Sequence, residues 1–284
     1  TSSLLAAIAF SFSGFFVMQI RHINMINTAI WIPLLFLLIE LYFKGKNMVY
    51  IVFAGIVFGI QVLAGHFQIA YYSVIGTSLY FLFKSGQDYF QESRLKRKTP
   101  FSLDGLKFLP MRIWILLLIF VIGGGLSALQ ILPTYEFTQQ GTRAQGMNFE
   151  EAVGWPYPPS HLITFIFPYF YGDYADATYH AEGTLAWENC GYVGIMTLIL
   201  AIVSLVLFKS NGYVRFYSLF CVLSLCLAMG KYTPLFKLFW TYVPGADYFR
   251  FPNRFLLFAA LSLCVLAGFG MNYLLNKIKG KKLA

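Results

Sequence analysis

The sequence predicts an all-α integral membrane protein with about eight transmembrane helices and one long outer loop. Of its 284 residues, 58% are hydrophobic and only 12% are charged, whereas soluble domains carry about 25% charged residues. Apolar runs recur along the whole chain and approach the ~20 residues that a helical span needs. Basic residues gather in alternate connections, as they do in the cytoplasmic loops of membrane proteins. We therefore expect residues 1–284 to form a single polytopic membrane domain.

Eight apolar runs are the expected spans. They cover residues 4–20, 25–43, 48–65, 67–83, 112–133, 189–208, 213–230 and 252–275. The fifth contains Gly123-Gly124-Gly125, small residues that let membrane helices pack closely or unwind locally. The sequence starts at Thr1 inside an apolar run, and we expect it to be a fragment of a longer protein.

The distribution of positive charge predicts the topology. The net charge is +9, but it collects in four places that alternate along the chain, as expected for a cytoplasmic face attracted to anionic lipid. This placement argues against a nucleic-acid partner and puts both ends of the sequence in the cytoplasm. Fifteen of the 21 basic residues lie there: Lys44, Lys46, Lys84, Arg94, Lys96, Arg97, Lys98, Lys107, Arg112, Lys209, Arg215, Lys277, Lys279, Lys281 and Lys282.

The outer loop, residues 134–188, is the one long segment that cannot cross a membrane. It holds seven of the twelve acids and a single strong base, Arg143. It is also rich in aromatic residues, which disordered linkers lack, so we expect an ordered lid over the outer surface. Within it, Ser160 is expected to cap a short interfacial helix over residues 161–167. Phe165, Phe167 and Tyr169 would then lie at the membrane surface.

Arg250 and Arg254, at the outer start of the last expected span, carry the strongest chemical signal. Positive charge is disfavoured on that side of the membrane, and a helix N-terminus repels cations. Pro252 suits a first helical turn, and two arginines four residues apart share a helix face. A bound phosphate would resolve the conflict, because helix N-termini and arginine forks both favour it. Alternatively, the arginines anchor the helix and pair with Asp247 or with acids of the lid.

Other polar residues at the expected outer helix ends are further candidates for substrate binding. They are Arg21, His22, His66, Gln68 and Gln130. Polar groups at membrane depth are often functional, and the short turn over residues 64–68 requires neither a histidine nor a glutamine. The alternatives are a hydrogen bond that ties two helix ends together for His66 and Gln68, and a simple interfacial anchor for Arg21.

Two acids are candidate catalytic residues. Glu136 lies at the C-terminal end of the fifth expected span, where the helix dipole disfavours negative charge, so it needs a partner such as an outer arginine. Glu188 precedes the sixth span and is either a catalyst or a helix cap.

Metal and cofactor sites are not expected. The four cysteines lie in the expected spans without a CxxC pair, which argues against both disulfides and zinc. His161 and His180 of the lid have no spacing typical of metal ligands.

Four segments carry a resemblance to a known family. They are Gly65-His66-Phe67-Gln68, Gln130-x-x-Pro133-x-x-Glu136, Gly191-Tyr192-Val193-Gly194-Ile195 and Phe249-Arg250-Phe251-Pro252-Asn253-Arg254-Phe255. In this order, over nearly the whole chain, they resemble the bacterial YfhO-type membrane proteins, which belong to the GT-C-like glycosyltransferases. Each segment alone is short, so their order carries the resemblance.

The resemblance implies an enzyme of the bacterial cytoplasmic membrane that works on the outer face. It would move a sugar from a polyprenyl-phosphate-linked donor to an acceptor of the cell envelope. Such enzymes commonly take their catalytic acid from the first outer loop. Here the first acid, Glu40, lies at the cytoplasmic end of its span, so we expect the catalytic acid to lie upstream of the fragment.

Two rival interpretations involve no chemistry: a lipid-linked glycan transporter and a non-catalytic assembly protein. A transporter would place polar residues near the bilayer centre. In the expected spans the polar residues gather instead at the outer ends, which favours the enzyme.

Overall fold

The computed structural model describes residues 1–95, 103–141, 144 and 146–282, with side chains omitted for residues 94–95, 103–109 and 279–282. No strand occurs among the described residues, and the all-α class is confirmed. The chain forms two compact units, residues 22–144 and residues 1–21 together with 145–284. Each unit is described by itself.

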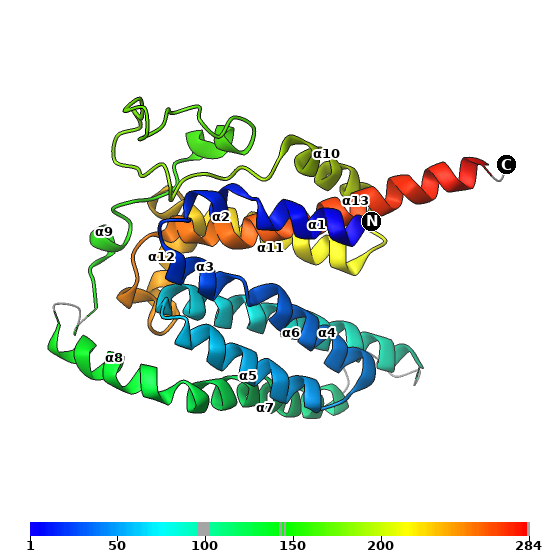
Figure 1. Ribbon diagram of the computed structural model, residues 1–284. Helices are drawn as coiled ribbons and strands as arrows, with labels where there is room; N and C mark the ends of the chain where they lie inside the picture. The colour runs from blue at the N-terminus through cyan, green and yellow to red at the C-terminus, as the bar shows by residue number, and fades with distance from the viewer. Residues whose placement is uncertain (96–102, 142–143, 145, 283–284) are drawn as a thin grey trace. The chain divides into compact units, whose positions relative to one another are not determined.

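The unit of residues 22–144 is a bundle of consecutive helices. They are α3 (Ile23–Ala29), α4 (Ile32–Gly45), α5 (Val49–Leu63), α6 (Phe67–Leu95), α7 (Leu103–Leu126) and α8 (Ala128–Gln140). Helix α5 packs against α4 and α7, and α6 packs against α3 and α4 (Figure 1). Helices α7 and α8 meet at an angle of 81°.

Glycines bring α5 and α7 into close contact. A methyl group added to Gly123 would lie 2.9 Å from the Gly55 carbonyl oxygen and 3.0 Å from the Gly59 nitrogen. The expected close packing of small residues is therefore found at Gly123. Gly124 and Gly125 face open space instead, so the triple glycine does not act as one unit.

Gly123→Ala is expected to lower the free energy of unfolding by about 1–3 kcal/mol, because the new methyl group overlaps backbone atoms that cannot rotate away. Gly125→Ala is the matched control, since its methyl group would meet nothing within 4 Å. It should leave stability unchanged or raise it by up to about 1 kcal/mol through helix propensity. Thermal unfolding in detergent measures both effects, and equal melting temperatures for the two variants would contradict the close contact.

The second unit is built around the last helix. Its helices are α1 (Ser2–Ser11), α2 (Gly14–Met18), α10 (Ile195–Ser204), α11 (Gly212–Ala228), α12 (Pro234–Tyr242) and α13 (Leu256–Lys282). Short 3-10 turns join them: η2 (Leu205–Leu207), η3 (Gly230–Tyr232), η4 (Ala246–Tyr248) and η5 (Pro252–Phe255). Helix α13 packs against α1, α10 and α11, and its first three turns are almost entirely buried.

The lid differs in detail from its prediction. Helix α8 continues to Gln140, so the lid starts later than residue 134 and contains only α9 (Phe149–Ala152) and the 3-10 helix η1 (Pro159–Phe165). Ser160 does not cap η1, because Pro158 occupies the N-cap position. Phe165 is buried, so of the three expected interfacial aromatics only Phe167 and Tyr169 are exposed. Arg143 lies outside the described residues.

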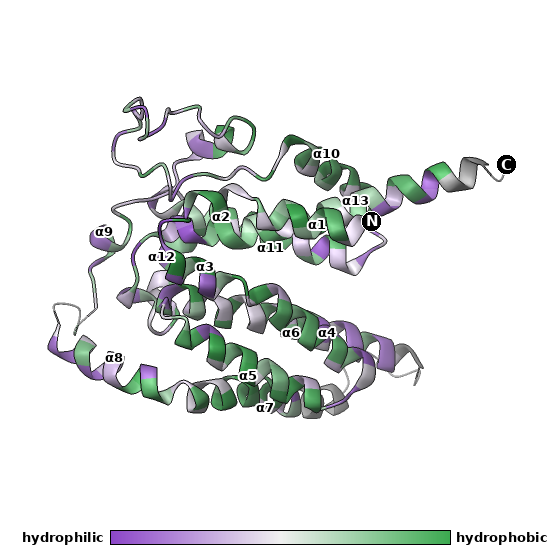
Figure 2. Cartoon of the chain, viewed as in Figure 1, coloured by the Kyte–Doolittle hydropathy of each residue, from purple (hydrophilic) through white to green (hydrophobic). Residues whose placement is uncertain are grey.

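The expected eight spans are not confirmed. By length and hydropathy, residues 23–45 and 252–278 are spans, and the bent pair α7–α8 is a third if it is counted as one. Four other apolar segments of the described chain have at most 17 residues, about 26 Å of helix against a hydrocarbon core of about 30 Å. Breaks shorten them: α1 ends before Ser13, and α10 starts only at Ile195. Hydrophobic residues nonetheless predominate in most of these helices (Figure 2).

Candidate functional site

The entrance to α13 holds both arginines that the sequence singled out. Pro252 starts the 3-10 turn η5, as predicted for a helix start. Arg250 precedes this turn, so the two arginines are not neighbours on one helix face, contrary to expectation. Between them, Phe251 has a left-handed backbone with φ of +66°, a conformation that is unfavourable for a residue with a bulky side chain.

Both guanidinium groups contact the ring of Phe251. The guanidinium carbon lies 4.9 Å from the ring centroid for Arg250 and 4.5 Å for Arg254, both within the range of cation–π contacts. Arg250 is exposed, whereas the side chain of Arg254 is 13% exposed. Backbone strain of this kind persists where the surrounding contacts fix it. The two arginines therefore contact the same aromatic ring, although they do not share a helix face.

Glu188 is the partner of Arg254. The Arg254 Nη2 donates to Glu188 Oε1 at 2.8 Å, and its Nε lies 3.2 and 3.3 Å from the two carboxylate oxygens. The Glu188 side chain is only 2% exposed. Glu188 does not cap α10, whose N-cap is Gly194. The predicted alternative, an arginine paired with an acid of the lid, is thus found for Arg254.

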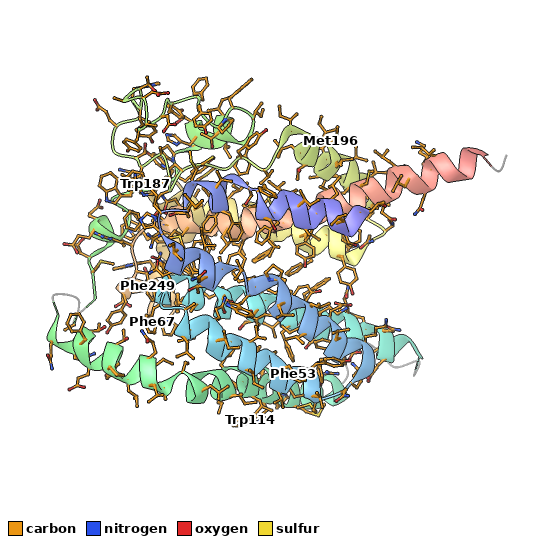
Figure 3. The ribbon with its side chains drawn as sticks, viewed as in Figure 1. Phe53, Phe67, Trp114, Trp187, Met196 and Phe249 are labelled. Atoms are coloured by element: carbon orange, nitrogen blue, oxygen red, sulfur yellow. The ribbon has the colours of Figure 1, made fainter. Side chains whose placement is uncertain are left out.

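A second pair of side chains joins the same two segments. Asn253 Nδ2 donates to Asn189 Oδ1 at 2.8 Å, and Asn189 Nδ2 donates to the carbonyl oxygen of Pro156 at 3.2 Å. Gln19 of the α2 end donates to the Trp187 carbonyl oxygen at 3.0 Å, where the lid returns to the helices (Figure 3). The end of the lid is therefore fixed to the entrance of α13 on one side and to the first helices on the other.

The lid has an ordered interior around His161, which the sequence did not identify. The imidazole stacks on Tyr171 with ring centroids 4.2 Å apart. The Tyr157 hydroxyl donates to the His161 carbonyl oxygen at 2.6 Å. Burial lowers the pKa of His161 to about 4, so the imidazole is neutral near pH 7. No group of three metal-ligating side chains occurs among the described residues.

Most of the remaining candidates belong to the unit of residues 22–144 and are described within it. His66 Nδ1 accepts from the Ile69 N–H at 3.2 Å and so caps the start of α6. Gln68 is buried and donates to the Tyr72 hydroxyl at 2.9 Å. Glu136 is exposed and Gln130 half-buried on α8, and Arg21 and His22 are both exposed in the segment between α2 and α3.

Comparison with known proteins decides the family. A family model described as bacterial membrane protein YfhO matches residues 1–284. The chain belongs to the YfhO family. Its membrane location and the resemblance carried by the four segments are thereby confirmed. No curated protein and no solved structure matches the chain.

This YfhO-family chain also contains a buried polar stripe on α6. Ser73, Thr77, Tyr80, Lys84 and Asp88 are four, three, four and four residues apart, and such spacing puts them on one helix face. All except Asp88 are classed as buried, and the Asp88 side chain is 16% exposed. The Ser73 and Thr77 hydroxyls have no hydrogen-bond partner among the described residues.

Ion pairs hold the far end of this stripe. Tyr80 and Lys84 donate to the Glu40 carboxylate at 2.9 and 3.1 Å. Asp88 accepts from Arg112 at 2.5 Å and also pairs with Lys46. The charge distribution predicted that these basic residues belong to a solvated cytoplasmic face. The i, i+4 spacing on α6 indicated instead that residues of this helix share a buried surface.

Proposed function

We propose that this YfhO-family protein is a membrane glycosyltransferase. It moves a sugar from a polyprenyl-phosphate-linked donor to a cell-envelope acceptor on the outer face of the bacterial cytoplasmic membrane. The observation that carries the proposal is the arginine pair on Phe251 at the entrance of α13. Guanidinium groups bind phosphate oxygens in a planar fork, and a polyprenyl phosphate is the leaving group of such a transfer.

The geometry supports different roles for the two arginines. Arg250 is exposed, and its guanidinium is the one that a donor phosphate reaches first. Arg254 is largely buried and its charge is balanced by Glu188, so we expect the charge of Arg250 to be the one that acts on the donor phosphate. Positive groups that are fixed before the reaction stabilise the charge that develops on a leaving phosphate.

The catalytic base remains a choice between acids. Glu188 is engaged in the fork with Arg254, which favours an orienting role. Glu136 is exposed on α8 and is the second candidate. Either acid, or one contributed from outside residues 1–284, would take the proton from the acceptor hydroxyl as the sugar is transferred. Aromatic residues of the lid would stack on the sugar faces.

The test is donor binding by the purified protein in lipid nanodiscs. Arg250→Ala should weaken the binding of a polyprenyl phosphate about 10- to 100-fold, since a hydrogen bond to a charged group contributes about 1.5–3 kcal/mol. Arg250→Lys should recover only part of the affinity, because lysine lacks the planar fork. The matched control is Arg215→Ala, another exposed arginine, on α11, which should bind normally. Equal binding of the phosphate-free polyprenol and the polyprenyl phosphate would contradict the proposal.

A second candidate function is transport of a lipid-linked glycan across the membrane. The observation in its favour is the polar stripe of α6, whose Ser73 and Thr77 hydroxyls are buried within the helix bundle of residues 22–144. Polar groups inside such a bundle are typical of transporters. One experiment distinguishes the enzyme from the transporter: the protein is reconstituted in vesicles with a labelled lipid-linked sugar. Transfer to an acceptor without movement between leaflets supports the enzyme, and movement without transfer supports the transporter.

A further inference from the structure

The lid consists of an apolar part followed by an acidic part. Residues 162–170 contain no charged side chain, whereas residues 173–182 contain Asp173, Asp176 and Glu182. Five large side chains of the apolar part are exposed, by 41 to 61% of their surface: Leu162, Ile166, Phe167, Tyr169 and Phe170. We call these five side chains the apolar lid surface. Contiguous exposed apolar surfaces of soluble proteins mark sites of contact with another molecule or with a membrane.

These side chains cannot turn inward, because the inner side of the lid is already filled. Phe165 is buried against Gly191, where an added methyl group would lie 2.5 Å from the Phe165 ring. The Thr164 hydroxyl accepts from the Gly191 N–H at 3.1 Å. His161 occupies the remaining inner position in its stack on Tyr171. The inner contacts therefore hold the apolar lid surface facing outward.

The apolar lid surface is followed along the chain by the exposed apolar face of α10. Gly191, which Phe165 contacts, precedes the first residue of α10 by only four positions. Exposed apolar side chains continue along that helix at Ile195, Met196, Ile199 and Ile202. In Figure 1 the lid and α10 lie on the same side of α1, and Figure 3 marks Met196 on that helix. In a protein of a membrane family, such an outward apolar helix face contacts lipid.

We propose that the apolar lid surface inserts into the headgroup region of the membrane leaflet next to it, while residues 173–182 stay in water. Lipid fits this surface because its aliphatic, phenylalanine and tyrosine side chains match the interface between headgroups and acyl chains. The acidic part is repelled by the same layer, since exposed carboxylates lose hydration and face anionic lipid there. The lid would then lie across the boundary with its two parts on opposite sides.

Insertion of the apolar lid surface would fix the depth of the entrance of α13 relative to the lipid headgroups. Insertion of amphipathic surfaces reaches about 5–10 Å below the headgroups. Glu188, at the end of the lid, is paired with Arg254, so the arginine pair is tied to a segment held near that level. This anchoring requires no catalytic activity and is tested without any substrate.

A cysteine-linked environment-sensitive fluorophore tests the proposal. It is placed at Phe167 or, in the control, at Asp176, in a Cys226→Ser background, because Cys190, Cys221 and Cys264 are buried. Full-length protein is reconstituted in vesicles of phosphatidylethanolamine and phosphatidylglycerol. A spin-labelled lipid with its quencher near the headgroup should quench the Phe167 probe at least about twofold more than the Asp176 probe, as shallow insertion requires. Iodide in the water should quench in the reverse order.

Equal iodide quenching at both positions would overturn the proposal, because the apolar lid surface would then be in water. Protection of the Phe167 probe from both quenchers would overturn it too, since protein would then cover the surface. Tyr169→Cys, also exposed in the apolar part, repeats the measurement if the Phe167→Cys protein does not fold.

Discussion

Arg254→Ala is expected to lower the free energy of unfolding by about 3–5 kcal/mol, because it removes the partner of a buried carboxylate. Glu188 is 2% exposed and receives two nitrogens of Arg254. Without them its charge stays in a site that water does not reach. From the sequence alone, Arg254→Ala is expected to abolish sugar transfer in the full-length protein and to leave expression in the membrane largely intact. The structure adds a loss of stability, because the partner of Arg254 is buried.

A double variant that neutralises both partners separates the cost of the buried charge from the cost of lost packing. In Arg254→Met combined with Glu188→Gln no charge is left buried, so this double variant should regain most of the stability that Arg254→Ala loses. Chemical unfolding in detergent, followed by the far-UV circular dichroism of the helices, measures the three proteins. A double variant as unstable as Arg254→Ala would show that packing around Phe251, and not the buried charge, causes the loss.

Asp88→Ala is expected to have a similarly large effect on the unit of residues 22–144. One carboxylate serves both Arg112, whose side chain is 4% exposed, and Lys46, which is 44% exposed. Its removal leaves the guanidinium buried over the rings of Tyr42 and Phe43, where we expect a cost of about 3–5 kcal/mol. The melting temperature of the purified protein should fall accordingly.

Two controls locate this effect at Arg112. Lys46→Ala should cost only about 0–1 kcal/mol, since a half-exposed ion pair is screened by water. Asp176→Ala, an exposed acid of the lid, should leave the melting temperature unchanged. If Lys46→Ala destabilised the protein as much as Asp88→Ala does, the buried arginine would not be the reason.

The sequence predicted what local patterns determine. Apolar runs predicted the helical class, Pro252 predicted the start of the last helical segment, and the aromatic content predicted an ordered lid. Helix continuity was predicted less well, since a hydropathy pattern does not show where the backbone turns. Residues 25–43 form one largely apolar run, yet they divide into α3 and α4 before Pro33.

The candidate site depends on contacts between distant residues, which no local pattern contains. Arg254 and Glu188 are 66 residues apart, so the sequence offered several acids as partners and could not choose among them. The role of Phe251 follows from its left-handed backbone, which sequence patterns predict for glycine rather than for phenylalanine. The stripe of α6 was visible in its spacing, but burial was needed to show that it faces other helices.

The distance along the sequence between Glu188 and Arg254 also determines when this contact can form during synthesis. Glu188 and Asn189 pair with residues 66 and 64 positions further along the chain. At about 5–20 residues per second, the ribosome needs roughly 3–13 s to make that intervening stretch. Throughout this interval Glu188 and Asn189 lack the residues with which they pair in the folded protein. Completion of the lid is therefore a late event, coupled to the arrival of the last helix in the membrane.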